Sequence, residues 1–100
     1  MSFFDFAKYV LIGLAAAAAV VFVVSIISTS TIREKAKEIA KEKAINAYSL
    51  KINEMLKKNE YNEVHIGLRD ENCEQIDEFV LKAKDVDNDI YVGREFLIYD

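Results

Sequence analysis

The hydrophobic and polar positions divide the chain into three stretches with different periodicities. The first is uniformly apolar, because no charged residue occurs between Tyr9 and Ile32. A helix of about 24 residues is about 36 Å long, which is enough to cross a hydrocarbon core of about 30 Å. The segment is apolar on every side, so only lipid or copies of the same helix could surround it. It predicts a membrane-spanning or assembly-buried helix over residues 1–30.

A cleavable export signal is the main alternative for this stretch. Such signals combine a basic start with an apolar region of about 7–15 residues. Here the start, MSFFDFAK, holds one lysine and one aspartate, and the apolar run is longer. The pattern therefore favours a retained helix. Lys8 alone precedes the run, whereas Arg33 and several lysines follow it, so the positive-inside rule places the C-terminal part in the cytoplasm.

Small side chains gather on part of the predicted membrane helix. In lipid, small residues let two helix backbones approach closely, which favours helix association. The alternative is that the alanines only propagate the helix. The predicted helix-packing interface consists of Gly13, Ala15, Ala16, Ala17, Ala18 and Ala19.

The second stretch has the periodicity of an amphipathic helix, predicted over residues 31–59. Its apolar residues recur at steps of three and four between Ile32 and Leu56, which places them on one stripe. Ser28 to Thr31 are candidate N-caps, and Thr31 with Glu34 fits a capping box. The apolar stripe includes Ile32, Ala36, Ile39, Ala40, Tyr48, Ile52 and Met55.

The third stretch, residues 60–100, has the period of half-buried strands. Val64, Ile66 and Leu68 alternate with polar residues, which predicts one strand. A hairpin is predicted between residues 79–83 and 90–98, with turn residues at 87–89. Residues 73–83 also fit a helix, because their apolar positions sit at helical spacing, and we favour a strand from Phe79.

These stretches together predict an α+β fold. Its long N-terminal helix spans a membrane, continues into the amphipathic helix and packs on a small three-stranded antiparallel sheet. The last strand would leave aromatic and aliphatic side chains on its outer face, where a monomer has no use for them. The possible partner face consists of Tyr91, Leu97 and Tyr99, the alternative being ordinary surface aromatics.

Composition removes several classes of function. The 100 residues carry a net charge of −4 with interleaved signs, which argues against a nucleic-acid partner. Cys73 is the single cysteine and has acidic neighbours, so neither a disulfide nor a reactive thiolate is expected. His65 is the single histidine and has no recognisable catalytic or metal-ligand spacing around it, which favours a plain surface residue.

The acidic turn at residues 85–89 deserves comparison with a calcium loop. Asp85, Asp87 and Asp89 match the first half of such a loop, but Ile90 stands where glycine is needed and Phe96 where glutamate is needed. No phosphate-binding loop or nucleophile elbow occurs in the sequence. We therefore predict no metal site, no cofactor and no enzymatic activity.

An acidic residue at the fifth position, Asp5, followed by the apolar segment LIGLAAAAAV, resembles the start of type IV pilins and pseudopilins. The predicted order of apolar helix, amphipathic helix and sheet is similar to that family's layout. The sequence departs from the family at Lys8, in lacking a mid-helix proline and in lacking a basic leader that ends in glycine. The resemblance implies that Asp5 forms an inter-subunit salt bridge and that the C-terminal part lies outside the cell.

The sequence thus predicts a non-enzymatic, single-pass membrane protein that is a small structural or accessory subunit of a multi-subunit assembly. Its expected partners are membrane lipid and other protein subunits, contacted through the N-terminal helix and the sheet, with a homo-oligomer left open. A pilin-like filament subunit is one alternative. A membrane-anchored binding adaptor and the membrane protein of a lipid-containing virion are two others.

Overall fold

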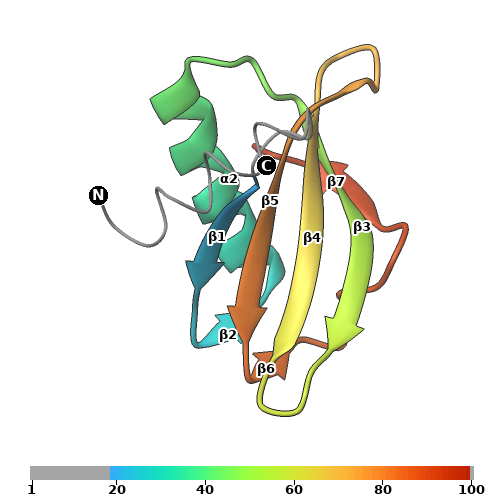
Figure 1. Ribbon diagram of the computed structural model, residues 1–100. Helices are drawn as coiled ribbons and strands as arrows, with labels where there is room; N and C mark the ends of the chain where they lie inside the picture. Colours follow the sequence, from blue (N-terminus) through green and yellow to red (C-terminus); the bar gives the residue numbers. More distant parts are fainter. Residues whose placement is uncertain (1–18, 100) are drawn as a thin grey trace.

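The computed structural model describes residues 19–99 and arranges them around a mixed five-stranded sheet with the order β1-β5-β4-β3-β7 (Figure 1). A two-stranded sheet, β2-β6, lies at one end, and helix α2 packs against the larger sheet. The elements are β1 Val20–Val23, β2 Ile26–Ile27, α2 Thr29–Lys43, β3 Ser49–Lys57, β4 Asn62–Arg69, β5 Gln75–Ala83, β6 Asp85–Val86 and β7 Glu95–Leu97.

The topology places the first strand beside the last long one. Strands β3, β4 and β5 form an antiparallel meander, and β1 pairs with β5 in parallel, with Val20 opposite Phe79. It follows that β1 and β3 point the same way and that α2 connects them across the sheet. The hairpin β4-β5 fills the space between them, and the short β7 pairs with the outer edge of β3 in antiparallel orientation.

One face of the sheet forms the core with α2. The helix buries Ile32, Ala36, Ile39 and Ala40, so the predicted apolar stripe is confirmed over these residues. Both sheet edges also reach the helix, because Lys35 Nζ lies 5.0 Å from the ring centre of Phe22 in β1 and Arg33 Nε donates to Leu97 O in β7 at 2.9 Å. The sheet residues that are fully buried in this core include Leu50, Ile52, Val64, Ile66, Leu68, Phe79 and Leu81.

The prediction of a long N-terminal helix is wrong for the part of that segment that the structure describes. Residues Val20–Val23 and Ile26–Ile27 are strands, and the helix begins only after Ser28, whose side chain accepts a hydrogen bond from the N–H of Thr31 at 3.1 Å. The physical reason is the run of valine and isoleucine, since β-branched side chains favour strands when a neighbouring strand can pair with them. Strand β5 supplies that neighbour.

The predictions about a membrane depended on this helix. Within residues 19–99, no helix has both the length and the apolar character needed to cross a membrane. The predicted single-pass membrane localisation, with a cytoplasmic head or in a pilin-like extracellular filament, is therefore wrong. Val20, Phe22, Val24 and Ile27 pack in or against the core instead.

The amphipathic helix is shorter than predicted, since it ends at Lys43 instead of continuing to residue 59. Ala44 adopts a left-handed conformation (φ 53°, ψ 44°), which stops the helix, and residues Ser49–Lys57 form the strand β3. Apolar residues at 50, 52 and 55 satisfy a strand as well as a helix, because a bulge between Ile52 and Glu54 shifts the alternation by one residue.

The C-terminal prediction is confirmed for two strands, but the return strand over residues 90–98 is reduced to Glu95–Leu97 and the predicted pairing is wrong. The strand at Asn62–Arg69 is present, and the segment from Phe79 is a strand that begins earlier, at Gln75. The predicted hairpin between residues 79–83 and 90–98 does not form, because β5 lies between β4 and β1. The final strand β7 pairs with β3, so a three-stranded sheet is wrong for this fold.

Candidate functional site

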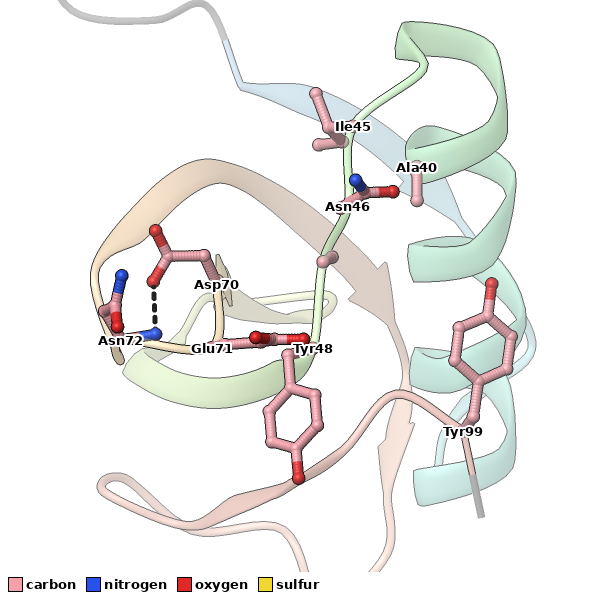
Figure 2. A pocket seen from close by; sticks show the side chains of 9 residues that line it. Ala40, Ile45, Asn46, Tyr48, Asp70, Glu71, Asn72 and Tyr99 are labelled. Atoms are coloured by element: carbon pink, nitrogen blue, oxygen red, sulfur yellow. Dashed lines mark hydrogen bonds between the residues drawn. The ribbon is translucent and has the colours of Figure 1, made fainter.

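An open cavity of about 500 Å³ lies at the end of the sheet where α2 stops (Figure 2). Its walls come from the helix end, the 45–48 segment, the turn between β4 and β5, and the C-terminal Tyr99. The lining residues are Ala40, Ile45, Asn46, Ala47, Tyr48, Asp70, Glu71, Asn72 and Tyr99. Segments far apart in the sequence thus meet at one site.

The end of α2 builds the first wall. The left-handed Ala44 directs its N–H to the carbonyls of the last helical turn, and the N–H of Ile45 bonds to Ala40 O at 3.0 Å. The chain then leaves the helix in an extended form. Tyr48 fixes this segment to the sheet, because its N–H bonds to Arg69 O at 2.8 Å and its carbonyl accepts from Ile98 N at 3.1 Å.

The turn between β4 and β5 builds the acidic wall. The carboxylate of Asp70 accepts hydrogen bonds from the N–H groups of Asn72 (2.8 Å) and Glu74 (3.0 Å), the first of which is drawn in Figure 2. Cys73 closes the turn with a positive φ of 65°. One oxygen of Asp70 is therefore occupied by the turn, while Glu71 is exposed and extends toward the 45–48 segment in Figure 2.

The cavity combines negative charge with exposed aromatic rings. Tyr48 and Tyr99 are 51% and 62% exposed, and the lining includes two carboxylates but neither lysine nor arginine. The ring of Tyr99 already attracts a cation, since Lys37 Nζ lies 5.1 Å from its centre. Aromatic faces and carboxylates both stabilise cations, so the cavity suits a basic side chain or an amine.

A second group of charged residues surrounds His65 on the sheet face away from α2. Its Nε2 lies 2.8 Å from Glu63 Oε2 and 3.9 Å from Glu54 Oε1, while Nδ1 lies 3.4 Å from Glu78 Oε1. Burial lowers the pKa of His65, but the hydrogen bonds and charges of Glu63 and Glu78 together outweigh it and raise the pKa above its ordinary value. His65 is thus a half-buried ion-pair partner and not a plain surface residue.

A glycine leaves room for a second polar network on the same face. Asn53 Nδ2 donates to Gln75 Oε1 at 2.8 Å and to Glu78 Oε2 at 3.0 Å, which links β3 to β5 across β4. The amide groups pass directly over Gly67, where an added Cβ would overlap with Gln75 Oε1. The network therefore requires a residue without a side chain at this position.

The predicted partner face is only partly brought together. Tyr91, Leu97 and Tyr99 are all exposed, but Tyr91 lies in the loop before β7, Leu97 lies in β7, and Tyr99 reaches the cavity. Tyr48, Asp70 and Glu71 were missed by the sequence reasoning, because Tyr48 fitted the stripe of the expected helix. The acidic turn residues after Arg69 were the one available signal.

Several predicted site residues carry no structural description. Asp5, Gly13 and Ala15 to Ala18 lie outside residues 19–99, so the inter-subunit salt bridge and most of the helix-packing interface stay predictions. Ala19 is described, and it lies half-buried directly before β1 instead of within a helix.

The residues considered for metal and thiol chemistry are placed apart from one another. Asp85 belongs to β6, whereas Asp89 accepts a hydrogen bond from Thr29 Oγ1 at 3.3 Å. Among residues 19–99, no group of three or more His, Cys, Asp or Glu side chains is arranged to hold a metal ion. Cys73 is exposed on the β4–β5 turn.

Comparisons with protein-family models, with curated proteins and with solved structures found no match for this chain. The resemblance to type IV pilins therefore stays a prediction from the sequence, without the long helix on which its layout was based.

Proposed function

We propose that this protein is a non-enzymatic accessory subunit that binds a partner protein by taking one of the partner's basic side chains into the cavity of Figure 2. The observation that carries the proposal is the composition of the cavity wall. Two acidic residues and two exposed tyrosines line the cavity, without a lysine or arginine among the lining residues. A basic side chain would gain both charge pairing and ring contact there.

Glu71 and Tyr48 are the residues expected to contribute most to binding. One carboxylate oxygen of Asp70 accepts the hydrogen bonds of the turn, and Lys37 already lies over the ring of Tyr99. Glu71 is exposed, and Tyr48 is held in place by two backbone hydrogen bonds to neighbouring strands. A tyrosine whose backbone is held in place loses less conformational entropy when a ligand binds.

A binding role also agrees with the surroundings of the nucleophilic and basic side chains in the described part of the chain. The neighbours that contact His65 are carboxylates, and Cys73 is exposed on the turn that follows the strand of that histidine. Neither arrangement forms the pair of nucleophile and base that acyl transfer requires.

The test is a titration of the full chain, labelled with ¹⁵N, with N-acetyl-arginine amide. We expect saturable shifts of the amides of residues 46–48 and 70–72, and no shifts there with the neutral N-acetyl-glutamine amide. The Glu71→Gln variant should bind the arginine probe about two- to fivefold more weakly, as loss of a partly exposed ion pair implies.

Glu60→Gln is the matched control, since Glu60 is an exposed carboxylate at the turn between β3 and β4. This variant should leave the affinity for the arginine probe unchanged. Equal weakening by both variants, or shifts confined to other parts of the sheet, would overturn the assignment of the cavity.

A further inference from the structure

The two edges of the five-stranded sheet are built differently. At one edge, β7 has three residues, and Arg33 of α2 donates from Nε to the carbonyl of Leu97 at 2.9 Å. Glu95 in the same strand forms an ion pair with Arg69. Short length, charged side chains and a blocked carbonyl are the features by which proteins prevent pairing at an edge.

The other edge, β1, is also short, with four residues, but it carries no charged side chain. Its sequence is VVFV, and no charged residue occurs in the chain from Ala19 to Ile32. Within residues 19–99, β1 has a single neighbouring strand, β5. Val23 is 82% exposed, which is the largest exposure among the exposed large hydrophobic side chains of the described residues.

The hydrogen-bond phase shows which residues of β1 offer free backbone groups at the outer edge. The N–H of Val24 donates to Lys82 O at 2.9 Å, so the even-numbered residues turn their backbone groups toward β5. Successive residues of a strand point their N–H and C=O groups to opposite sides. Val21 and Val23 therefore direct theirs away from the sheet.

The side chains of these two residues also extend an apolar strip on the face away from α2. Val21 lies opposite Val80, which is only 4% exposed although it is on this face. Further along the face, His65 and the carboxylates around it make the surface polar. The apolar part of this face thus lies at the β1 edge, beside the unpaired backbone groups.

We propose that two copies of this chain pair through their β1 strands, antiparallel and related by a two-fold axis. A strand without charge can lie against its own copy without repulsion between like charges, and a two-fold interface closes after one contact. The opposite, blocked edge prevents the joined sheets from growing further. The second copy would cover Val23 and continue the apolar strip of Val21 and Val80.

The phase of β1 restricts the register to pairs of odd-numbered residues, and the proposed dimer uses the register that pairs Val21 with Val23. In this register, Val21 of one copy lies opposite Val23 of the other, and the two residues exchange N–H···O=C hydrogen bonds. The two-fold axis passes beside Phe22, so this pair occurs twice in the dimer. In such a hydrogen-bonded pair the two Cα atoms lie about 5.5 Å apart, which is within the range that a disulfide can bridge. Val21 and its own copy are offset along the strands and lie too far apart for a disulfide.

The register makes a cross-linking test specific. In full-length chains carrying Cys73→Ser, we prepare Val21→Cys and Val23→Cys separately and oxidise each alone and the two mixed. We expect a disulfide-linked dimer from the mixture and at most traces from either variant alone. No product in the mixture, or equal products in all three samples, overturns the proposal.

Sedimentation of the unlinked chain gives an independent measurement. The molar mass measured for the 11.4 kDa chain should be that of a dimer, and the Val23→Lys variant should have the molar mass of a single chain. Leu97→Lys is the control, because Leu97 is 45% exposed on the blocked edge, and it should leave the dimer intact. A wild-type monomer would overturn the proposal without affecting the cavity.

Discussion

The Nε2 atom of His65 lies 2.8 Å from Oε2 of Glu63, two residues earlier on the same strand, and the opposite ring nitrogen faces Glu78 of β5 at 3.4 Å. The imidazole thus joins two carboxylates on neighbouring strands. Both ring nitrogens can donate only when the ring is protonated, so this arrangement favours the charged form.

This arrangement predicts a pH-dependent contribution to stability. The pKa of His65 is raised in the folded state, so its contribution is complete below the unfolded pKa of about 6.5 and is lost as the pH rises through the folded pKa. Comparing the wild type with His65→Gln by urea unfolding should give a difference of about 0.5 kcal/mol at acidic pH, in the range of partly exposed ion pairs. The difference should shrink at alkaline pH. A difference independent of pH would show that the ring acts by packing alone.

Substitution of Gly67 should destabilise the fold through the polar network above it. In Gly67→Ala the new methyl group would meet Gln75 Oε1 and Asn53 Nδ2, which must separate. We expect a loss of about 1 kcal/mol in the free energy of unfolding, as for one disrupted hydrogen bond. In a Gln75→Ala background, the same substitution should cost less, because the nearer of the two obstructing side chains is gone and Asn53 can move into its space. Equal costs in the two backgrounds would assign the effect to the backbone of β4.

A glycine in place of Ala44 should stabilise the protein. Ala44 has a φ of 53° at the end of α2, where residues with a Cβ atom are disfavoured and glycine is common. Ala44→Gly should raise the free energy of unfolding by about 0.5–1 kcal/mol. Lys41→Gly provides the opposite control, because it lies inside the helix and should lose about 0.5–1 kcal/mol. Thermal unfolding of the three proteins measures both changes.

Removal of the cap at the start of α2 should weaken the helix. Ser28 Oγ accepts a hydrogen bond from the N–H of Thr31, which would otherwise lack a partner within the helix. Ser28→Ala should lower the free energy of unfolding by about 1 kcal/mol, while Ser28→Asp should retain most of it. Similar losses in both variants would mean that the bond between Ser28 Oγ and Thr31 Oγ1 matters more than the cap.

Local patterns predicted the local structure well in two places. The alternation of Val64, Ile66 and Leu68 identified β4, and the spacing of Ile32, Ala36 and Ile39 identified the buried face of α2. In both segments the polar residues exclude the competing periodicity. The cap at Ser28 was also among the predicted candidates, since a short polar side chain before a periodic segment marks a helix start.

The remaining differences come from long-range pairing, which a local pattern does not contain. The run from Val20 to Ile27 is uncharged and apolar except at Ser25, so it fits a buried helix and a buried strand equally well. Its pairing with β5 decides the outcome, and β5 comes late in the chain. The cavity depends on the same pairing, because Tyr48 and Glu71 approach each other only after β3, β4 and β5 have assembled.

The position of β1 beside β5 has a consequence for biosynthesis. A ribosome releases the N-terminal strand long before it has made the residues that pair with it, since Phe79 stands opposite Val20. During that interval the nascent chain exposes an apolar, uncharged segment that can bind a chaperone or aggregate with another nascent chain. Slow translation between the two strands would therefore lengthen the time during which the segment can aggregate, and completion of β5 would end it.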